Sequence, residues 1–297
     1  MKSKLLAICL AAAAAAFAGN AMAINLGGGG PIKIKFSNWE NLDAAAVGAC
    51  FAAGGGAVVS CSNGVEDNYG VLAITQILKD DGSNQILYNS GDGGQYLSGV
   101  FYGIDIHRVF AVPGGFRVDS TSGFLDIWQN STGFNASNGS GYNAGAYYNG
   151  VNHTQYNGIT NVAGGSLYLS LAFASGINPA DGMTTLRGNF DSLSLPATGS
   201  AASYLNVTGG SAFNTFNTDG FPSGFGARDM FQTSTFCTNG TLGCPSNGLP
   251  GSAQGDWNLL SEDPVRANAV PEPASLLLVG AALVGLGLSR RKAKTAA

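Results

Sequence analysis

Acidic side chains in strand-like segments are the residues of this chain best suited to acid–base chemistry. Four such aspartates occur: Asp105, Asp119, Asp126 and Asp191. Two carboxyl groups that converge in a cleft can serve as the acid and the base of a glycosidase. The sequence does not place any two of them together, so a glycan-cleaving site stays an alternative to ordinary strand-end carboxylates.

Motifs for other kinds of catalysis are missing from the sequence. Its two histidines, His107 and His153, do not have the H-E-x-x-H spacing of a zinc enzyme. The chain also contains no G-x-S-x-G nucleophile elbow, no phosphate-binding P-loop and no dinucleotide fingerprint. We therefore expect a noncatalytic protein without a cofactor.

Two acidic turns offer oxygen atoms to a hard cation. One contains Asp80, Asp81 and Asn84, the other Glu66 and Asp67, and neither matches the EF-hand register. Turn chemistry explains these residues equally well. A structural calcium ion stays open as an alternative, and we assign no metal ligands.

The amino terminus has the layout of a secretory signal peptide. Lys2 and Lys4 precede an apolar stretch, and Ala21 and Ala23 place small residues where a signal peptidase reads the chain. We expect the general secretion machinery to recognise residues 1–23 and cleavage to follow Ala23.

Four cysteines remain after this segment is removed: Cys50, Cys61, Cys237 and Cys244. An even number of cysteines in an exported chain is typical of disulfides. Glycines between the members of each near pair allow the chain to fold back, so we predict the bonds Cys50–Cys61 and Cys237–Cys244. A zinc site of four thiolates is the alternative, but the C-x-x-C spacing is missing.

The carboxyl terminus combines a short polar motif, an apolar run and a basic cluster. These parts are Pro271, Glu272 and Pro273, then residues 274–289, then Arg290, Arg291 and Lys292. The prolines keep the motif extended, so a helix can begin only after it. The uncharged residues 274–288 would make a helix about 22 Å long, which spans the roughly 30 Å hydrocarbon core only marginally. The basic cluster would stay cytoplasmic.

This tail resembles the PEP-CTERM sorting domain of exported Gram-negative proteins, over residues 270–292. The resemblance implies that exosortase, a membrane-embedded cysteine protease, recognises Pro271, Glu272 and Pro273 and removes the tail. It also implies export across the inner membrane, transient anchoring there, and delivery to the cell surface or the extracellular matrix. Association with exopolysaccharide or biofilm is implied as well. An ordinary single-span tail anchor is the alternative.

The composition favours β structure between the two ends. With 45 glycines, long helices are unfavourable because each helical glycine costs about 1 kcal/mol relative to alanine. Residues 24–270 contain eight Lys and Arg and seventeen Asp and Glu, a net charge of −9 that repels phosphate backbones. We therefore expect one β-rich domain over residues 24–268, no nucleic-acid partner, and a sorting tail over residues 269–297.

Short apolar segments separated by turns predict the strands of this domain. They favour an all-β fold, an antiparallel sandwich or jelly roll, flanked by the signal helix and the tail helix. The predicted strands are 69–78, 85–88, 96–112 with bulges at Gly99 and Gly103, 116–119 and 124–129 about a turn at 120–123, 167–173, 185–195 and 202–208. Residues 130–165 are predicted to be an irregular loop.

The sequence thus indicates where the protein is delivered more clearly than what it does there. Residues 64–70, 203–210 and 260–265 also resemble secreted PEP-CTERM proteins, and they imply a related ectodomain without catalytic residues. We expect a noncatalytic surface or matrix protein. A secreted glycan-active enzyme and a carbohydrate-binding module are the alternatives.

Overall fold

The domain is built on one antiparallel sheet of ten strands. The computed structural model describes residues 24, 26, 29–54, 60–133, 165–194, 197–238 and 259–270. The strands of the large sheet are β1 (Gly30–Leu42), β2 (Asn68–Lys79), β3 (Ile86–Asn89), β4 (Tyr96–Val112), β5 (Gly115–Asn130), β6 (Ser166–Ala174), β7 (Leu186–Phe190), β8 (Thr198–Gly209), β11 (Met230–Thr238) and β12 (Leu259–Ala269). The strands β9 (Phe221–Ser223) and β10 (Gly226–Arg228) form a separate two-stranded sheet.

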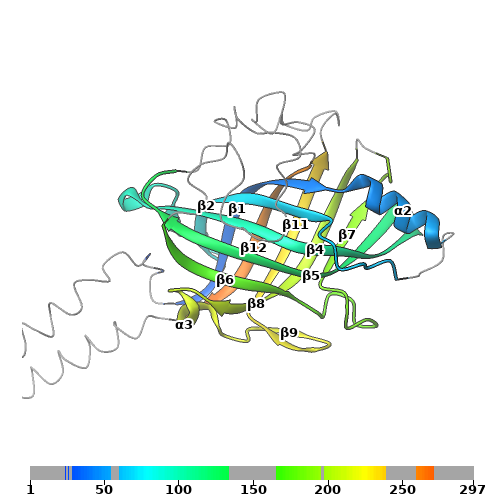
Figure 1. The fold of residues 1–297 in the computed structure, drawn as a ribbon. Helices are drawn as coiled ribbons and strands as arrows, with labels where there is room; N and C mark the ends of the chain where they lie inside the picture. Colours follow the sequence, from blue (N-terminus) through cyan, green and yellow to red (C-terminus); the bar gives the residue numbers. More distant parts are fainter. Residues whose placement is uncertain are drawn as a thin grey trace, which may run out of the picture.

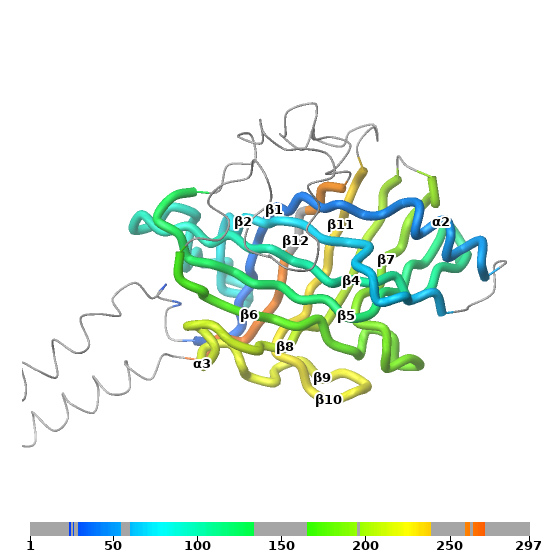
Figure 2. The backbone as a smooth tube through the Cα atoms, in the orientation of Figure 1, coloured from blue at the N-terminus to red at the C-terminus, as the bar shows by residue number. Residues whose placement is uncertain are grey.

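The large sheet closes on itself. Its strands follow the order β1-β12-β11-β8-β6-β5-β4-β2, and β2 pairs again with β1. The strands β6 and β7 share the space between β5 and β8. Figures 1 and 2 show the strands wrapping around a common interior. The predicted antiparallel all-β class is confirmed, but the predicted sandwich or jelly-roll layout is wrong because the pairings form one closed sheet and not two packed ones.

Alternation along β1 shows how the sequence fills the interior. Ile32, Ile34 and Phe36 are buried, while the intervening Lys33 and Lys35 are half-buried or exposed. Because successive side chains of a strand point to opposite faces, the apolar residues line the interior and the lysines face outward. β1 lies between β12 and β2, so this strand has no free edge.

β4 and β5 form a long hairpin about Pro113 and Gly114. The predicted bounds of β4 are confirmed, but the predicted turn at residues 120–123 is wrong because β5 runs through it. Ser122 (φ 62°) and Gly123 (φ 108°) have positive φ angles, and Gly103 opposite them has φ 70°. The turn-forming residues therefore kink both strands together.

Short helices lie at the two ends of the closed sheet (Figure 1). The helix α2 (Ala44–Gly54) follows β1 at one end, where its Val47 and Cys50 pack with Leu42 and Val109. The helix α3 (Phe213–Phe216) lies at the other end, where the side chain of Phe216 is fully buried. A single 3-10 turn, η2 (Asp92–Gly94), precedes β4.

Several predicted segments fall outside the described residues. They are the signal peptide 1–23, most of the predicted loop 130–165, and the tail after Val270 with its predicted helix 274–289. Of that loop, residues 130–133 and 165 are described, and Asn130 is the last residue of β5. Within the described ranges, no helix is both long and apolar enough to cross a membrane.

Candidate functional site

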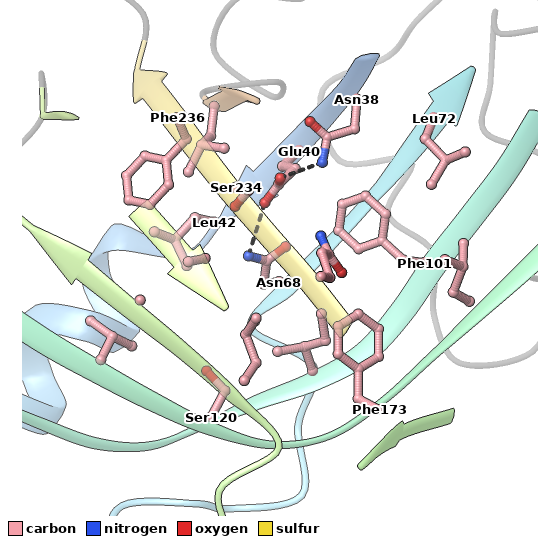
Figure 3. A pocket seen from close by; sticks show the side chains of 18 of the residues that line it. Asn38, Glu40, Leu42, Asn68, Leu72, Phe101, Ser120, Phe173, Ser234 and Phe236 are labelled. Carbon is pink, nitrogen blue, oxygen red and sulfur yellow. Dashed lines mark hydrogen bonds between the residues drawn. The ribbon is translucent and has the colours of Figure 1, made fainter. Parts of the chain in front are cut away.

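A cavity of about 60 Å³ lies inside the closed sheet. Nine of the strands contribute to its lining, which extends from Phe36 to Leu42 on β1 and therefore lies toward the α2 end. Most of the wall is apolar, including the rings of Phe36, Phe101, Phe173, Phe190 and Phe236. Figure 3 labels Phe101, Phe173 and Phe236 among them. Six polar side chains interrupt it: Asn38, Glu40, Asn68, Ser120, Gln232 and Ser234.

Glu40 is the centre of the polar wall. Asn38 Nδ2 donates a hydrogen bond to Glu40 Oε1 (2.6 Å), and Ser261 Oγ donates to the same oxygen (3.0 Å). Asn68 Nδ2 lies 3.3 Å from Glu40 Oε2. Figure 3 shows the three side chains of Asn38, Glu40 and Asn68 pointing toward one another. Strands β1, β2 and β12 thus position one carboxyl group inside an apolar chamber.

The environment of Glu40 favours the neutral carboxylic acid. Burial raises its pKa above the ordinary value of 4.5, and the hydrogen bonds from Asn68, Ser261 and Asn38 offset only part of this effect. No Lys, Arg or His occurs among the described residues that line the cavity. A buried carboxyl group without a cation is more stable protonated. The wall therefore presents neutral hydrogen-bonding groups.

Asn68 contributes an amide oxygen without a partner. Its Oδ1 atom is buried and accepts no hydrogen bond from any described residue. Its Nδ2 atom donates a hydrogen bond to Glu40. Exchanging the two ends of the amide would satisfy the oxygen from a protonated Glu40 and leave the NH₂ group free, so one polar end of Asn68 is unpaired in either orientation.

A second polar cluster is organised around Asp119, whose side chain is fully buried. Arg108 Nη2 lies 3.2 Å from Asp119 Oδ2, and Arg187 Nε lies 3.0 Å from Asp119 Oδ1. Asp181 also contacts Arg108 and lies 3.5 Å from Nε2 of His107. The two arginines and two aspartates balance in charge, which is typical of a structural ion network.

The four aspartates proposed from the sequence as glycosidase candidates bind four different sets of partners. Asp119 pairs with arginines, and Asp105 accepts hydrogen bonds from the Ser62 hydroxyl and the Gly64 N–H. Asp126 accepts from the hydroxyls of Tyr102 and Ser170, and Asp191 accepts from Thr198. No two of the four share a partner in these contacts, and Asp105 also lies close to the carboxyl group of Asp67.

Two carboxyl groups of the predicted acidic turns have raised pKa values. Burial raises the pKa of Glu66 to about 7, although its carboxylate accepts the Gly103 N–H. Burial and the nearby Asp105 and Asp43 raise the pKa of Asp67 to about 6, while the Ile106 N–H opposes the shift. In the described ranges, no three His, Cys, Asp or Glu side chains gather as metal ligands do. The calcium alternative stays a hypothesis.

The predicted Cys50–Cys61 disulfide is confirmed, and it closes a loop with a sequence separation of 11. The Cys61 N–H donates to the His107 carbonyl oxygen, so the bond ties α2 to β4. Cys237 is also disulfide-bonded. Its predicted partner Cys244 lies outside the described residues.

The sorting signals adjoin the domain directly. The last residue of β12, Ala269, pairs with Gly30 at the start of β1, and the Val270 N–H donates to the Thr215 carbonyl oxygen of α3 (2.9 Å). Figure 2 shows the start of β1 and the end of β12 side by side near α3. The predicted signal-cleavage and sorting residues lie outside the described residues: Ala21, Ala23, Pro271, Glu272, Pro273, Arg290, Arg291 and Lys292.

Comparison with known proteins identifies the tail. Residues 269–292 match the PEP-CTERM protein-sorting motif. The chain therefore carries this motif directly after the closed sheet, and the motif implies export and processing by an exosortase. No curated protein and no solved structure matches the chain.

The cavity residues escaped the sequence analysis. Ile34, Phe36, Asn38 and Glu40 alternate along β1, so a strand reading of this segment would have shown two polar residues continuing an apolar face. Asn68 opens the predicted strand that begins one residue later. The available signal was thus a polar interruption of a buried face.

Proposed function

We propose that this protein is a noncatalytic component of the cell surface or extracellular matrix of a Gram-negative bacterium, sorted by exosortase and associated with exopolysaccharide. The observation that carries the proposal is the PEP-CTERM motif at residues 269–292, which begins at the last residue of β12. The signal-peptide layout of residues 1–23 supports the same route. In this proposal the apolar tail is held in the inner membrane only until it is removed.

The junction between domain and motif fits removal of the tail without damage to the fold. β12 ends at Ala269, and its backbone is paired with β1 up to that residue. Removal of the chain after the motif would leave every described strand intact. Val270, the last described residue, is hydrogen-bonded to α3.

Two tail variants and one control test the sorting step. Replacing Pro271, Glu272 and Pro273 with alanine should let the tail helix extend over the motif, so the protein should accumulate in the inner membrane with its tail attached. Deleting residues 274–297 should give a periplasmic protein that bypasses processing. Thr295→Ala, which lies beyond the matched residues 269–292, should be processed like the wild type.

Fractionation with a tag on each side of the motif reads out the result. Mass spectrometry of the mature carboxyl terminus gives the cleavage position and any covalent adduct. Normal cleavage and delivery of the triple-alanine variant would mean that the tail is an ordinary membrane anchor.

The noncatalytic part of the proposal is supported by the separate local contacts of Asp105, Asp119, Asp126 and Asp191. A glycan-active enzyme and a carbohydrate-binding module are its rivals. Incubation of the exported protein with matrix polysaccharides separates the three classes: turnover that one Asp→Asn substitution abolishes would identify an enzyme. Saturable binding without turnover would identify a binding module.

A further inference from the structure

The interior cavity combines two features that a packed core avoids. It leaves an empty space lined by residues of two hydrophobic clusters, and it buries a polar atom of Asn68 without a hydrogen-bond partner among the described residues. The Asn68 side chain belongs to a residue that is only 8% exposed. An unpaired buried amide is unfavourable, so it is expected where a bound molecule completes the hydrogen bond.

The walls restrict what that molecule can be. One water molecule needs about 10–15 Å³ of such space and two to four polar partners, so a chamber of about 60 Å³ with mainly apolar walls is a poor container for several waters. The five phenylalanine rings favour an apolar body. Because no described lining residue is cationic, a buried anion would have no counter-charge.

We propose that the cavity binds a small neutral alcohol or phenol, with its hydroxyl group on Asn68 and its apolar body against the phenylalanines. A hydroxyl group both donates and accepts a hydrogen bond, so it satisfies the free end of Asn68 in either amide orientation. Glu40 and Asn38 hold Asn68 in place. This binding is independent of how the tail is sorted.

The first test compares ligands of one shape on the protein as the cell delivers it. Phenol, toluene, benzoate and benzylamine are titrated by calorimetry, with ligand-observed NMR as a second readout. Phenol should bind with a dissociation constant of roughly 1 mM or tighter. Toluene should bind at least about fivefold more weakly, because it leaves Asn68 unpaired. Benzoate should not bind.

The same titrations can overturn the proposal without any variant. Absence of phenol binding, or equal binding of phenol and toluene, would show that the hydroxyl group does not complete a site. Tighter binding of benzylamine than of phenol would mean that the site binds a cation that pairs with Glu40, and not a neutral ligand.

A matched pair of variants locates the site. Asn68→Ala should abolish the preference for phenol over toluene, because the polar partner is gone. Asn206→Ala is the control, since Asn206 also has an unpartnered buried Oδ1 atom among the described residues but does not line the cavity. It should keep the preference of the wild type. Loss of the preference in both variants, or in neither, would contradict the assignment to Asn68.

Discussion

The two halves of the domain interior are filled in different ways. Toward α3 the interior is an apolar core, in which Leu205, Phe216 and Met230 are fully buried. Toward α2 it contains the cavity and the polar wall around Glu40. The same closed sheet surrounds both halves, so the difference lies in the side chains and not in the backbone. One half is packed for stability, while the other keeps a polar wall and empty space.

The contrast has a local cause on each side. At the α3 end, Phe216 packs edge-on against Tyr168, with ring centroids 6.4 Å apart, and fills the opening of the sheet. At the α2 end, the apolar face of β1 changes to Asn38 and Glu40, and three small or polar residues face them on other strands. Those three residues are Ser120, Gly188 and Ser234. Small side chains opposite polar ones leave the space unfilled.

The strongest test of this contrast removes one phenylalanine from each half. Phe216→Ala should reduce the free energy of unfolding by about 3–5 kcal/mol, because it opens a new cavity in a dense core. Phe236→Ala should cost less, since Phe236 already borders empty space and loses fewer contacts. Chemical denaturation of both variants gives the two values. Equal losses would mean that the halves are packed alike.

The next largest effect concerns how the α2 end is closed. Replacing both Cys50 and Cys61 with alanine should lower the free energy of unfolding by about 2–3 kcal/mol, because the unfolded chain regains the freedom of the loop. Hydrogen exchange should increase in α2 and at Cys61 but not at Phe216. Faster exchange at both ends would show that the disulfide stabilises the whole interior and not one half.

The sequence predicts the local features of the fold better than the long-range ones. The strand from Tyr96 to Val112 was predicted with its bounds, because alternation and a Pro-Gly turn are local signals. Closure of the sheet was not predicted, because it depends on pairing β1 with β12 across more than two hundred residues. Residues 120–123 have the composition of a turn, and only their pairing with β4 shows that they kink a continuous β5.

The candidate site was harder to predict than the fold. Asn38 and Glu40 come from β1 and Asn68 comes from β2, and only the register that pairs Leu42 with Asn68 brings the three side chains together. The disulfide Cys50–Cys61 and the sorting tail were predicted because each depends on residues close in sequence. Chemistry that depends on a long-range register has no comparable signal.

Glu40→Gln tests the polar half through its pH dependence. Because burial raises the folded-state pKa of Glu40 above 4.5, the folded protein holds a proton that the unfolded chain releases. The free energy of unfolding of the wild type should therefore fall as the pH rises above that ordinary value, by about 1.4 kcal/mol for each unit of raised pKa. Glutamine does not titrate, so the variant should lose less stability. If the stability of both proteins changed equally between pH 4 and pH 9, the pKa of Glu40 would not be raised in the folded state and the prediction would be wrong.

The smallest expected effect concerns Glu66, a partly exposed carboxyl group in the segment before β2, in comparison with Glu40. Burial raises the pKa of Glu66 from 4.5 to about 7, but solvent screens this half-buried group more than Glu40. The folded state again favours the proton, so its contribution is complete below about pH 4.5 and is lost as the pH rises through about 7. Glu66→Gln should flatten the melting profile only between these values and by less than Glu40→Gln does. Because Glu66 does not line the cavity, it should leave the preference for phenol unchanged. If Glu66→Gln changed the pH dependence of stability more than Glu40→Gln does, the main titrating group of this half would be Glu66, beside Gly103, and not Glu40 in the cavity.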